Sequence, residues 1–321
     1  PAIDSRLRQL ADKGFSPSSL SNYLRCPLRY YHANILAIRE PDTLDEDLDD
    51  SQFGSAVHRA LQLIYSPYAG RTVSADGLRQ ALADLPSIIG DTFADLYRNG
   101  RSHEGRNQFL LSVGQSQVKH LLQREIDLID HGTRIEIIGL EQKLHLPFPL
   151  PGSPIQPHLL GVIDRIDRID GQLRIIDYKT GKLRDNDTSV KVPEPEPGQI
   201  PDKWFQLMCY ALLYSLDHPL GETLHLGIQP LRQVRSGLHL AAWDGETDFT
   251  ADHIDRFSRL LATLLADLLN PDLEFAATPS DTNCAFCPVS PFCPARTAAA
   301  QHPHFDNSIT IVLQYFYNRL L

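Results

Sequence analysis

The stretch HLLGVIDRIDRIDGQLRIIDYKTGK, residues His158 to Lys182, decides how the centre of the chain folds. Apolar and charged residues alternate on both sides of Asp170-Gly171. An Asp-Gly pair between two alternating runs is a strong signal for a β-hairpin closed by a two-residue turn. The stretch therefore predicts two antiparallel strands joined at Asp170 and Gly171.

The same turn predicts which residues face one another across the hairpin. With the Asp-Gly pair in the loop, Ile169 faces Gln172, and counting back along both strands places Asp164 opposite Asp177. Directly opposed side chains have Cβ atoms about 5 Å apart, and like charges at that distance are destabilising. A divalent cation held by carboxylate oxygens would offset the repulsion, so we expect a metal site here. A bulge in either strand would break this register.

Lys179 adds a basic group to the two opposed acids. Because side chains alternate along a strand, Lys179 is expected on the same face as Asp177. An ammonium group in that position can orient a water molecule or offset charge that develops on a phosphate. The alternative interpretation is a solvated hairpin whose charged residues face water, since alternation of acidic and basic residues is common on exposed faces.

These residues also resemble a known family. The segments Gly161-Val-Ile-Asp164 and Asp177-Tyr178-Lys179 are similar to the core motif of PD-(D/E)XK nucleases, in the RecB-like branch found at the C-terminal ends of AddB-type helicase-nucleases. The resemblance implies a mixed α/β (α+β) fold with a restriction-endonuclease-like core, in which helices flank a central mixed sheet. It also implies that Asp164, Asp177 and the main-chain carbonyl of Tyr178 bind Mg²⁺ or Mn²⁺, and that Lys179 assists the attacking water.

A histidine earlier in the chain is a further candidate metal ligand. The pattern from Gln52 to Tyr65 predicts an amphipathic helix, and Gly54 and His58 lie four residues apart on one face of it. Taken alone, His58 fits a surface or core position better than a metal site. RecB-like nucleases carry a similar Gly-x-x-x-His on their first core helix, where the histidine contacts the metal, so the resemblance assigns His58 as a ligand.

The segment Arg134–Leu146 predicts a strand before the hairpin, so that three strands in succession form a meander. Glu141 on this strand could add a carboxylate to the site, and a surface role fits it at least as well. Two later runs, Leu224–Pro230 and Gly237–Trp243, predict further strands. They extend the core without indicating a function.

Two helical segments follow from the pattern. Residues from about 72 to 130 predict a helical insertion that shows no chemistry and could cover one side of the site. The segment Trp204–Tyr214 predicts a helix on which Gln206 and Tyr210 share a face. A buried amphipathic helix with an incidental glutamine would give the same spacing. A Gln-x-x-x-Tyr helix lines the DNA-binding cleft of RecB-like nucleases, so the resemblance assigns these two residues to DNA binding.

Three of the five cysteines form a compact Cys-x-x-Cys-x₅-Cys group: Cys284, Cys287 and Cys293. Cys26 is the best candidate for a fourth ligand. Sulfur ligands suit Zn²⁺ as well as an iron–sulfur cluster, and free thiols are the plain alternative. AddB-type nucleases and similar CRISPR-associated exonucleases place one cysteine before the core and three after it round a 4Fe-4S cluster, so the resemblance implies that cluster. Cys209 is expected to be a small buried residue.

The composition limits the classes to which the protein can belong. The chain has 321 residues, 42% of them hydrophobic, and a net charge of -10. No apolar run approaches the ~20 residues of a membrane span and no signal peptide is recognisable, so we expect a cytoplasmic location without membrane contact. The acidic balance argues mildly against a general nucleic-acid binder. Six of the acids lie between Asp42 and Asp50, however, and bound metals with a local basic strip could still accept a phosphate backbone.

The motifs predict one nuclease domain over residues 1–297. It would include the helical insertion at about 72–130 and the cysteine loop at 284–294. Residues 298–321 form a tail of unknown role that the family pattern does not explain.

The leading hypothesis is a metal-dependent DNA nuclease, in particular an exonuclease, that hydrolyses phosphodiester bonds within a helicase-nuclease of DNA repair or recombination. DNA and a helicase domain or subunit are the expected partners. One rival is a catalytically inactive DNA-binding or scaffold module stabilised by the cluster, against which the intact acid-acid-lysine set counts. A second rival is a cysteine-ligated redox protein. The chain begins at Pro1 and its only methionine is Met208, so either an initiator methionine was removed or this is a piece of a longer protein. The resemblance is to a domain normally carried on larger polypeptides, so we expect a piece.

Overall fold

The predicted hairpin is present as two antiparallel strands, β3 (His158–Ile169) and β4 (Gln172–Lys179). Asp170 has φ 50° and Gly171 has φ 90°, so both turn residues adopt the positive φ that a type I′ turn requires. From this turn back to Arg165, every cross-strand pair is the predicted one. The short turn thus sets the register of the strands that carry the candidate site.

The computed structural model describes residues 2–38, 49–96, 105–184, 186–192, 195, 200–278, 284–285, 287, 289–290 and 293. Two compact units are present. The larger comprises Pro1–Ser21 and Asp42–Leu273, and the smaller comprises Asn22–Pro41 and Glu274–Leu321. The C-terminal segment 298–321, expected to be a tail, lies outside the described residues.

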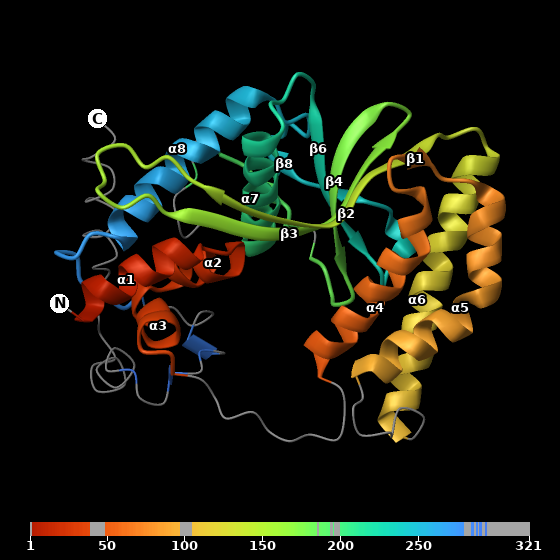
Figure 1. The fold of residues 1–321 in the computed structure, drawn as a ribbon, viewed down its shortest axis with the longest axis horizontal. Coiled ribbons are helices and arrows are strands. Elements are labelled where there is room, and N and C mark those ends of the chain that lie inside the picture. The colour runs from red at the N-terminus through yellow and green to blue at the C-terminus, as the bar shows by residue number, and fades with distance from the viewer. Residues whose placement is uncertain are drawn as a thin grey trace. The chain divides into compact units, whose positions relative to one another are not determined.

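A mixed sheet extends the hairpin on both sides, with the strand order β1-β2-β3-β4-β6-β7 (Figure 1). The added strands are β1 (Arg71–Thr72), β2 (Ile135–Pro147), β6 (Leu224–Pro230) and β7 (His239–Leu240). Strands β2, β3 and β4 form the predicted meander, whereas β4 and β6 are parallel. Parallel neighbours need a crossover, and α7 (Asp202–Asp217) provides it. The mixed sheet with its flanking helices confirms the predicted restriction-endonuclease-like fold class.

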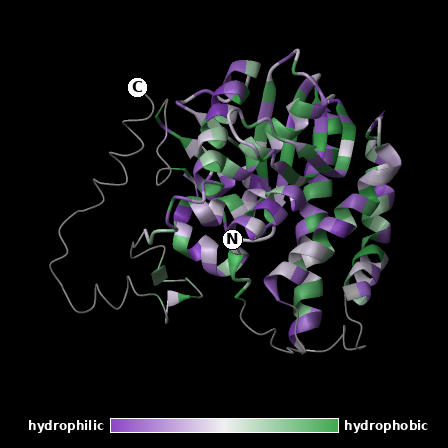
Figure 2. Ribbon diagram, turned by 60° about the vertical axis from the view of Figure 1, so that its left-hand side comes forward, coloured by the Kyte–Doolittle hydropathy of each residue, from purple (hydrophilic) through white to green (hydrophobic). Residues whose placement is uncertain are grey.

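Three helices pack together beside the sheet: α4 (Asp50–Tyr65), α5 (Ala75–Leu96) and α6 (Gly105–Asp130). Their apolar residues share one buried cluster with strand residues such as Ile176, which anchors α4 next to the end of β4. In Figure 2 these helices carry both hydrophobic and hydrophilic residues, as amphipathic helices do. The predicted helical insertion therefore consists of α5 and α6.

Helix α7 packs against β3 and against α8 (Ala251–Leu268). Gly161 on β3 permits the close approach, because a Cβ atom there would lie 2.9 Å from Leu213 Cδ1 and 3.1 Å from Tyr210 Cε1. Real Cβ atoms essentially never come as near as 2.9 Å to another heavy atom. The absence of a side chain at Gly161 thus sets how near α7 lies to the hairpin.

The predicted strand Gly237–Trp243 is divided between two sheets. Its first part is β7, and its last part is β8 (Ala242–Trp243), which pairs with β5 (Ser189–Val190) in a parallel two-stranded sheet. The chain changes partner at Ala241, whose N–H donates to Leu226 O at 2.7 Å. Two short 3₁₀ helices also belong to the larger unit, η2 (Ser66–Tyr68) and η4 (Val234–Ser236).

The chain starts with α1 (Ala2–Lys13) and α2 (Pro17–Arg25). Ser16 Oγ accepts a hydrogen bond from the Ser19 N–H at 3.2 Å, as an N-cap side chain does. Helix α2 ends directly before Cys26, which precedes a proline. The predicted position of Cys26 at a helix end is confirmed.

In the smaller unit, α3 (Pro27–Tyr30) continues into the π-helix η1 (Tyr31–Ile35). Aromatic rings hold this segment to the second half of the unit. The Tyr30 and Phe275 rings are stacked with centroids 6.3 Å apart, and the Tyr23 ring meets Tyr30 edge-on at 5.5 Å. Two stretches far apart in sequence are thus joined beside Cys26.

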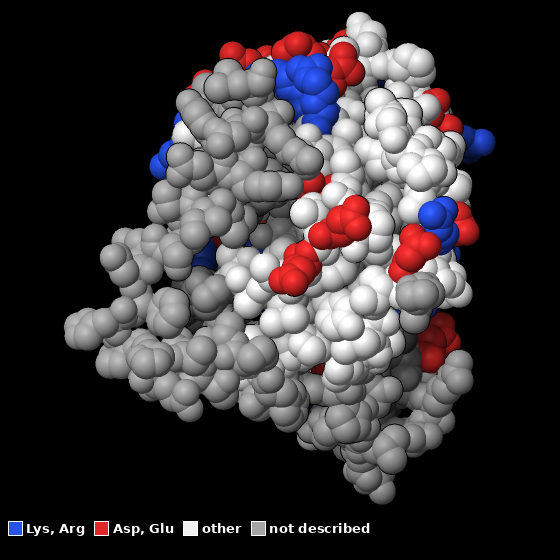
Figure 3. Space-filling model, turned by 90° about the vertical axis from the view of Figure 1, so that its left-hand side faces the viewer, with Lys and Arg blue, Asp and Glu red and all other residues white. Residues whose placement is uncertain are grey.

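The described surface carries both charge signs. On the face in Figure 3, the described charged side chains form small groups with uncharged residues between them, and some groups contain both signs. The described Lys and Arg residues form no continuous basic area there. Within the part of the chain that the structure describes, no helix combines the length and hydrophobicity needed to cross a membrane.

Candidate metal centre

The two acids of the hairpin lie just beyond its last regular pair, Arg165 and Ile176. There the Oδ2 atom of Asp164 accepts a hydrogen bond from the Tyr178 N–H at 2.8 Å, so the carboxylate ties β3 to β4. Asp177 is the residue after Ile176, and the charge of Asp164 contributes to the raised pKa of Asp177 described below. The hairpin thus brings together the two predicted acids.

Glu141 joins the acids from β2. The cross-strand pairs on either side of it place Glu141 opposite Asp164, in a register that follows a β-bulge between Ile137 and Gly139. Its backbone has φ 46°, in the left-handed region that costs a residue with a Cβ atom about 1–2 kcal/mol. Strain of this kind is concentrated at functional sites. The sequence left Glu141 open between site and surface, and the structure places it in the cluster.

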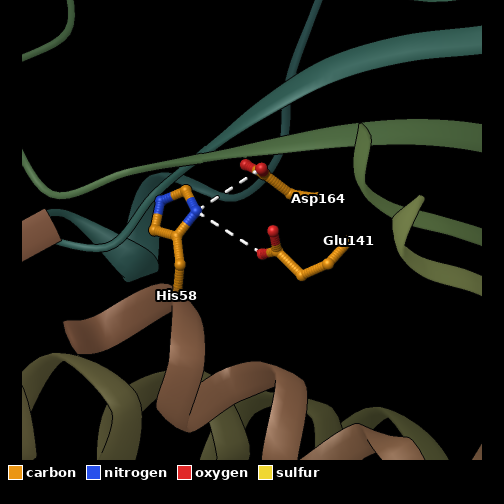
Figure 4. Close-up of side chains that lie close together, drawn as sticks. All are labelled: His58, Glu141 and Asp164. Carbon is orange, nitrogen blue, oxygen red and sulfur yellow. Dashed lines mark ion pairs between the residues drawn. The ribbon is translucent and has the colours of Figure 1, made fainter. Parts of the chain in front are cut away.

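His58 reaches the same cluster from α4. The helix begins with a capping box, in which the Asp49 side chain accepts from the Gln52 N–H at 2.7 Å. Nδ1 of His58 lies 3.4 Å from Asp164 Oδ1 and 3.8 Å from Glu141 Oε1, as Figure 4 shows. The ligand atoms of these three residues all lie within 4.8 Å of one another.

The main-chain carbonyl of Tyr178 faces the other nitrogen of the imidazole, since His58 Nε2 lies 3.0 Å from Tyr178 O. The predicted carbonyl and the predicted histidine therefore meet at the end of β4. The carboxylates of Glu141 and Asp164 and Nδ1 of His58 form a donor set that suits Mg²⁺ or Mn²⁺, whereas the Tyr178 carbonyl contacts the other ring nitrogen. The residues present fit a divalent cation.

Asp177 and Lys179 form an ion pair next to this group. The Lys179 ammonium lies 3.0 Å from Asp177 Oδ1 and 2.8 Å from Asp177 Oδ2. The Asp177 side chain is only 2% exposed, whereas that of Lys179 is 30% exposed. The lysine thus has the predicted place beside Asp177 and retains access to solvent.

The ionisation of the cluster shows how strongly its charges interact. Burial, together with the charge of Asp164, raises the pKa of Asp177 to about 6 against the opposing effect of Lys179. Burial and the Asp164 charge also raise the pKa of Glu141. Burial alone would lower the pKa of His58, but its hydrogen bond to Asp164 and the neighbouring carboxylates raise it. The cluster therefore favours an added positive charge, whether a proton or a metal ion.

A pocket of about 440 Å³ opens over the cluster. His58, Glu141, Tyr178 and Lys179 contribute to its lining, along with residues of α4 and the turn after β4. Gly54 lines it too, and a Cβ atom at that position would meet only Thr180 Oγ1, at an ordinary 3.6 Å. A ligand can thus reach the imidazole, a carboxylate and the ammonium from one side.

A buried network lies behind Tyr178. Arg165, which is 1% exposed, donates through Nη1 to Glu125 Oε1 at 2.9 Å and to the Tyr178 hydroxyl at 3.2 Å. Its Nε donates to Asp167 Oδ2 at 2.7 Å, and the Tyr65 hydroxyl donates to Glu125 Oε2 at 2.7 Å. Tyr178 is therefore held through its hydroxyl as well as through its backbone.

Neither Glu125 nor Arg165 was predicted from the sequence. The sequence nevertheless carries a feature that could have indicated each residue. Glu125 follows Leu121 and Leu122 on the buried stripe of α6, and Arg165 occupies an inward position between the apolar residues of β3. A charged residue at a buried position requires a partner, and these two are each other's partners.

Gln206 and Tyr210 interact on α7, where the Gln206 Nε2 donates to the Tyr210 hydroxyl at 2.7 Å. Burial raises the pKa of Tyr210, and the charges of Asp177 and Asp164 add to the rise. Cys209 between them is buried, as expected, and burial raises the pKa of its thiol.

The four cysteines of the predicted cluster all belong to the smaller unit: Cys26, Cys284, Cys287 and Cys293. All four are partly buried. Cys26 Sγ accepts from the Thr278 N–H at 3.4 Å, and the Cys287 N–H donates to Cys284 O at 3.3 Å. Among the described residues, the sulfurs are not gathered within 4.8 Å as the ligand atoms of His58 and its two acids are.

Comparisons with known proteins bear on this site. The sequence model of the PD-(D/E)XK nuclease superfamily matches residues 14–294. The search of curated proteins gives no match. Seven chains of solved structures match. One, titled "Crystal structure of SSO0001", is 13% identical, with a TM-score of 0.34 over 92% of this chain and 95% of that one.

Proposed function

The chain belongs to the PD-(D/E)XK nuclease superfamily, and we propose that it hydrolyses phosphodiester bonds of DNA as an exonuclease of the RecB-like branch. Membership supports a metal-dependent nuclease. The observation that carries the proposal is the gathering of His58, Glu141 and Asp164 next to the Asp177–Lys179 ion pair at one pocket.

The donor set assigns roles in the proposed reaction. His58, Glu141, Asp164, Asp177 and the carbonyl of Tyr178 would hold Mg²⁺ or Mn²⁺. When bound, the ion supplies positive charge to the phosphate oxygens and lowers the pKa of an attacking water.

The protein's own groups act around that ion. The Lys179 ammonium, held by Asp177, is placed to orient the water that attacks phosphorus and to offset the negative charge of the transition state. The Tyr178 N–H fixes the Asp164 carboxylate. Gln206 and Tyr210 would guide the DNA strand towards the acids from α7.

Degradation of end-labelled linear DNA tests the proposal. Single- and double-stranded substrates are incubated with Mg²⁺ or Mn²⁺ and the wild type, Asp177→Ala or Lys179→Ala. We expect the wild type to cleave and both variants to lose activity by at least about 100-fold, since each removes a transition-state interaction. Release of the terminal label as mononucleotides or short fragments would identify exonuclease action.

Lys119→Ala is the matched control for Lys179→Ala, because Lys119 is an exposed lysine on α6. It should retain wild-type activity. Full activity in Asp177→Ala would contradict the assignment of the site. Binding of DNA without cleavage by any of the proteins would favour the scaffold hypothesis instead.

We also propose that Cys26, Cys284, Cys287 and Cys293 hold a 4Fe-4S cluster. Support comes from their thiol donor set and from their place in one compact unit. Protein purified without oxygen should show a broad visible absorption and contain iron and sulfide. Cys293→Ser should lose these signals, whereas Cys209→Ser, which alters a buried cysteine of α7, should keep them. Zinc in place of iron and sulfide would support the Zn²⁺ alternative.

A helicase partner completes the proposal. The motif residues resemble those of AddB-type helicase-nucleases, and this resemblance is the support for a role in DNA repair or recombination. Co-purification with a helicase, followed by faster degradation of duplex DNA in the presence of ATP, would establish that role. Equal degradation with and without the helicase would count against it.

A further inference from the structure

One wall of the pocket is a polar stripe on α4. Its members follow one another at intervals of three or four residues: Ser51, Ser55, Arg59 and Gln62. The opposite face of α4 is apolar and buried, so the helix turns this stripe towards the pocket. His58, which contributes to the metal centre, directly precedes Arg59. The stripe therefore leads away from the metal centre along the helix.

Arg59 provides positive charge on this wall. Its side chain is held in place, because Nη1 donates to Gln62 Oε1 at 2.5 Å. Among the described residues, no carboxylate lies within ion-pair distance of Arg59, whereas Lys179 is already paired with Asp177. The Arg59 charge nevertheless reaches the cluster, where it opposes the rise in the pKa of Glu141. An arginine that is fixed but unpaired is suited to bind an anion.

We infer that Arg59 binds the phosphate next to the one that is cleaved, so that the substrate is a polynucleotide strand lying along α4. The inference rests on the proposed function, because the reacting phosphate is placed at the metal centre. A planar guanidinium can donate to two oxygens of one phosphate. The hydroxyl of Ser51 can contact the strand further along, whereas the Ser55 hydroxyl donates to Ser51 O at 2.9 Å.

The acid at the start of the helix does not prevent this contact. Asp50 also lines the pocket. It is nine residues before Arg59, which corresponds to about 13 Å along a helix and exceeds the screening length of physiological salt. Asp50 therefore adds little repulsion to a phosphate at Arg59.

Two substrates separate this role from a role at the reacting phosphate. A single-stranded oligonucleotide has neighbouring phosphates, whereas bis(4-nitrophenyl) phosphate has only the reacting one. In Arg59→Ala, we expect the ratio of kcat/KM for the oligonucleotide to kcat/KM for the small diester to fall about tenfold, mainly through KM. In Arg259→Ala, which removes an exposed arginine of the distant helix α8, the ratio should not change. An equal loss on both substrates, or no loss, would overturn the inference.

Binding gives a second readout that does not need cleavage. With Ca²⁺ in place of Mg²⁺, fluorescence anisotropy measures the affinity for the same oligonucleotide from 50 to 300 mM salt. Loss of one phosphate contact on a single strand reduces the slope of log K against log salt by about 0.7. Arg59→Ala should show this reduction. Arg59→Lys should retain the slope while binding more weakly, because it keeps the charge and loses the planar fork.

The experiments distinguish failure of the inference from failure of the proposed function. A wild type that binds the oligonucleotide but cleaves neither substrate contradicts the proposed function, and the salt slope then decides on Arg59. A wild type that cleaves both substrates while Arg59→Ala keeps the wild-type ratio and slope contradicts the inference alone. Inorganic phosphate can be added as a competitor for the site at Arg59. If it binds there as tightly as the oligonucleotide does, Arg59 belongs to a simple anion site, and the inference is overturned.

Discussion

Two buried carboxylates of the hairpin have opposite ionisation behaviour. Asp177 has its pKa raised to about 6 by burial and by Asp164. Burial alone would also raise the pKa of Asp167, but hydrogen bonds and ion pairs with Arg165 and Arg174 hold it below its usual value. The first carboxylate still lacks full charge compensation, while the second is compensated within the protein. This contrast is what the proposed function expects, with Asp177 as a metal ligand and Asp167 as a residue that stabilises the fold.

The state of Asp177 predicts how metal binding depends on pH. Without metal, Asp177 keeps its proton up to about pH 6, so that proton must leave before the carboxylate can bind an ion. We expect the affinity for Mn²⁺ to fall by up to about tenfold for each pH unit below 6 on account of Asp177. Above pH 6 the affinity should rise further, until His58, whose pKa is raised from 6.5, has also lost its proton. Isothermal titration calorimetry from pH 5 to 8 measures this dependence.

Asp177→Asn is the control for the pH dependence. It should bind Mn²⁺ more weakly and with a shallower dependence on pH, because Glu141 and His58 remain. The same steep dependence in both proteins would show that Asp177 does not release the proton that metal binding displaces.

The state of Asp167 predicts an effect on stability. Asp167→Asn removes the carboxylate that pairs with the partly buried Arg174 and leaves the buried Arg165 with Glu125 alone, so we expect the free energy of unfolding at pH 7 to fall by about 3–5 kcal/mol. Because the folded state lowers the pKa of Asp167 below 3.8, its stabilising effect is complete above that pH and is lost as the pH falls further. Urea unfolding at pH 7 and pH 3 tests both expectations.

Glu222→Gln is the matched control, since Glu222 pairs with Arg168 at the surface, where both side chains are at least 30% exposed. It should cost less than about 1 kcal/mol. Equal losses in Asp167→Asn and Glu222→Gln would mean that the buried network does not stabilise the fold beyond a surface ion pair.

At the scale of elements, the turn explains why part of the site could be predicted. The two-residue turn sets the register of β3 and β4 locally, so the pairing that leads to Asp164 and Asp177 follows from nearby residues. The place of Glu141 depends on the bulge before it and on how β2 returns to β3 after a connection rich in proline, and neither is visible in an alternating pattern. The division of the predicted strand 237–243 depends on the tertiary contacts of Ala241.

The contact between α7 and β3 yields a prediction of its own. In Gly161→Ala the new methyl group would collide with Leu213 and Tyr210, so α7 must shift. We expect a loss of about 1–3 kcal/mol in the free energy of unfolding, because overpacking strains a filled core. Tyr210 would move with the helix, and the KM for DNA should therefore rise as well.

Gly221→Ala provides the comparison, because nothing lies within 4 Å of a Cβ atom at that position. Urea unfolding and DNA-degradation kinetics of the two variants are measured side by side. Wild-type stability in Gly161→Ala would show that α7 can move away from β3 without cost.

At the scale of the whole larger unit, segments far apart in sequence converge on Tyr178. Its N–H binds Asp164 of β3 and its carbonyl meets His58 of α4. Its hydroxyl accepts from Arg165, whose charge is compensated by Glu125 of α6. The sequence indicated no chemistry in the helical insertion, because a single glutamate on an apolar stripe shows its purpose only once its partner is in place. The insertion thus does more than cover the sheet.

This arrangement predicts different effects for two conservative changes in the network. Tyr178→Phe removes the hydroxyl that binds Arg165, and Tyr65→Phe removes the hydroxyl that binds Glu125. Each should lower the free energy of unfolding by about 1–2 kcal/mol, since each leaves a buried polar group with one hydrogen bond fewer. Only Tyr178 carries the carbonyl and N–H of the metal centre. We therefore expect Tyr178→Phe to weaken Mn²⁺ binding by about tenfold, because hydrogen bonds that orient a metal ligand typically contribute about that much to metal affinity.

Tyr65→Phe serves as the control, because it disturbs the same network without touching the residue at the metal centre. Its affinity for Mn²⁺ should stay within about twofold of the wild type, because its effect must pass through Glu125 and Arg165. Calorimetric titration and urea unfolding of the two variants give both quantities. Equal losses of affinity would mean that the network acts only by stabilising the unit. A loss confined to Tyr178→Phe would mean that the Arg165 contact orients the backbone to which Asp164 and His58 are bound.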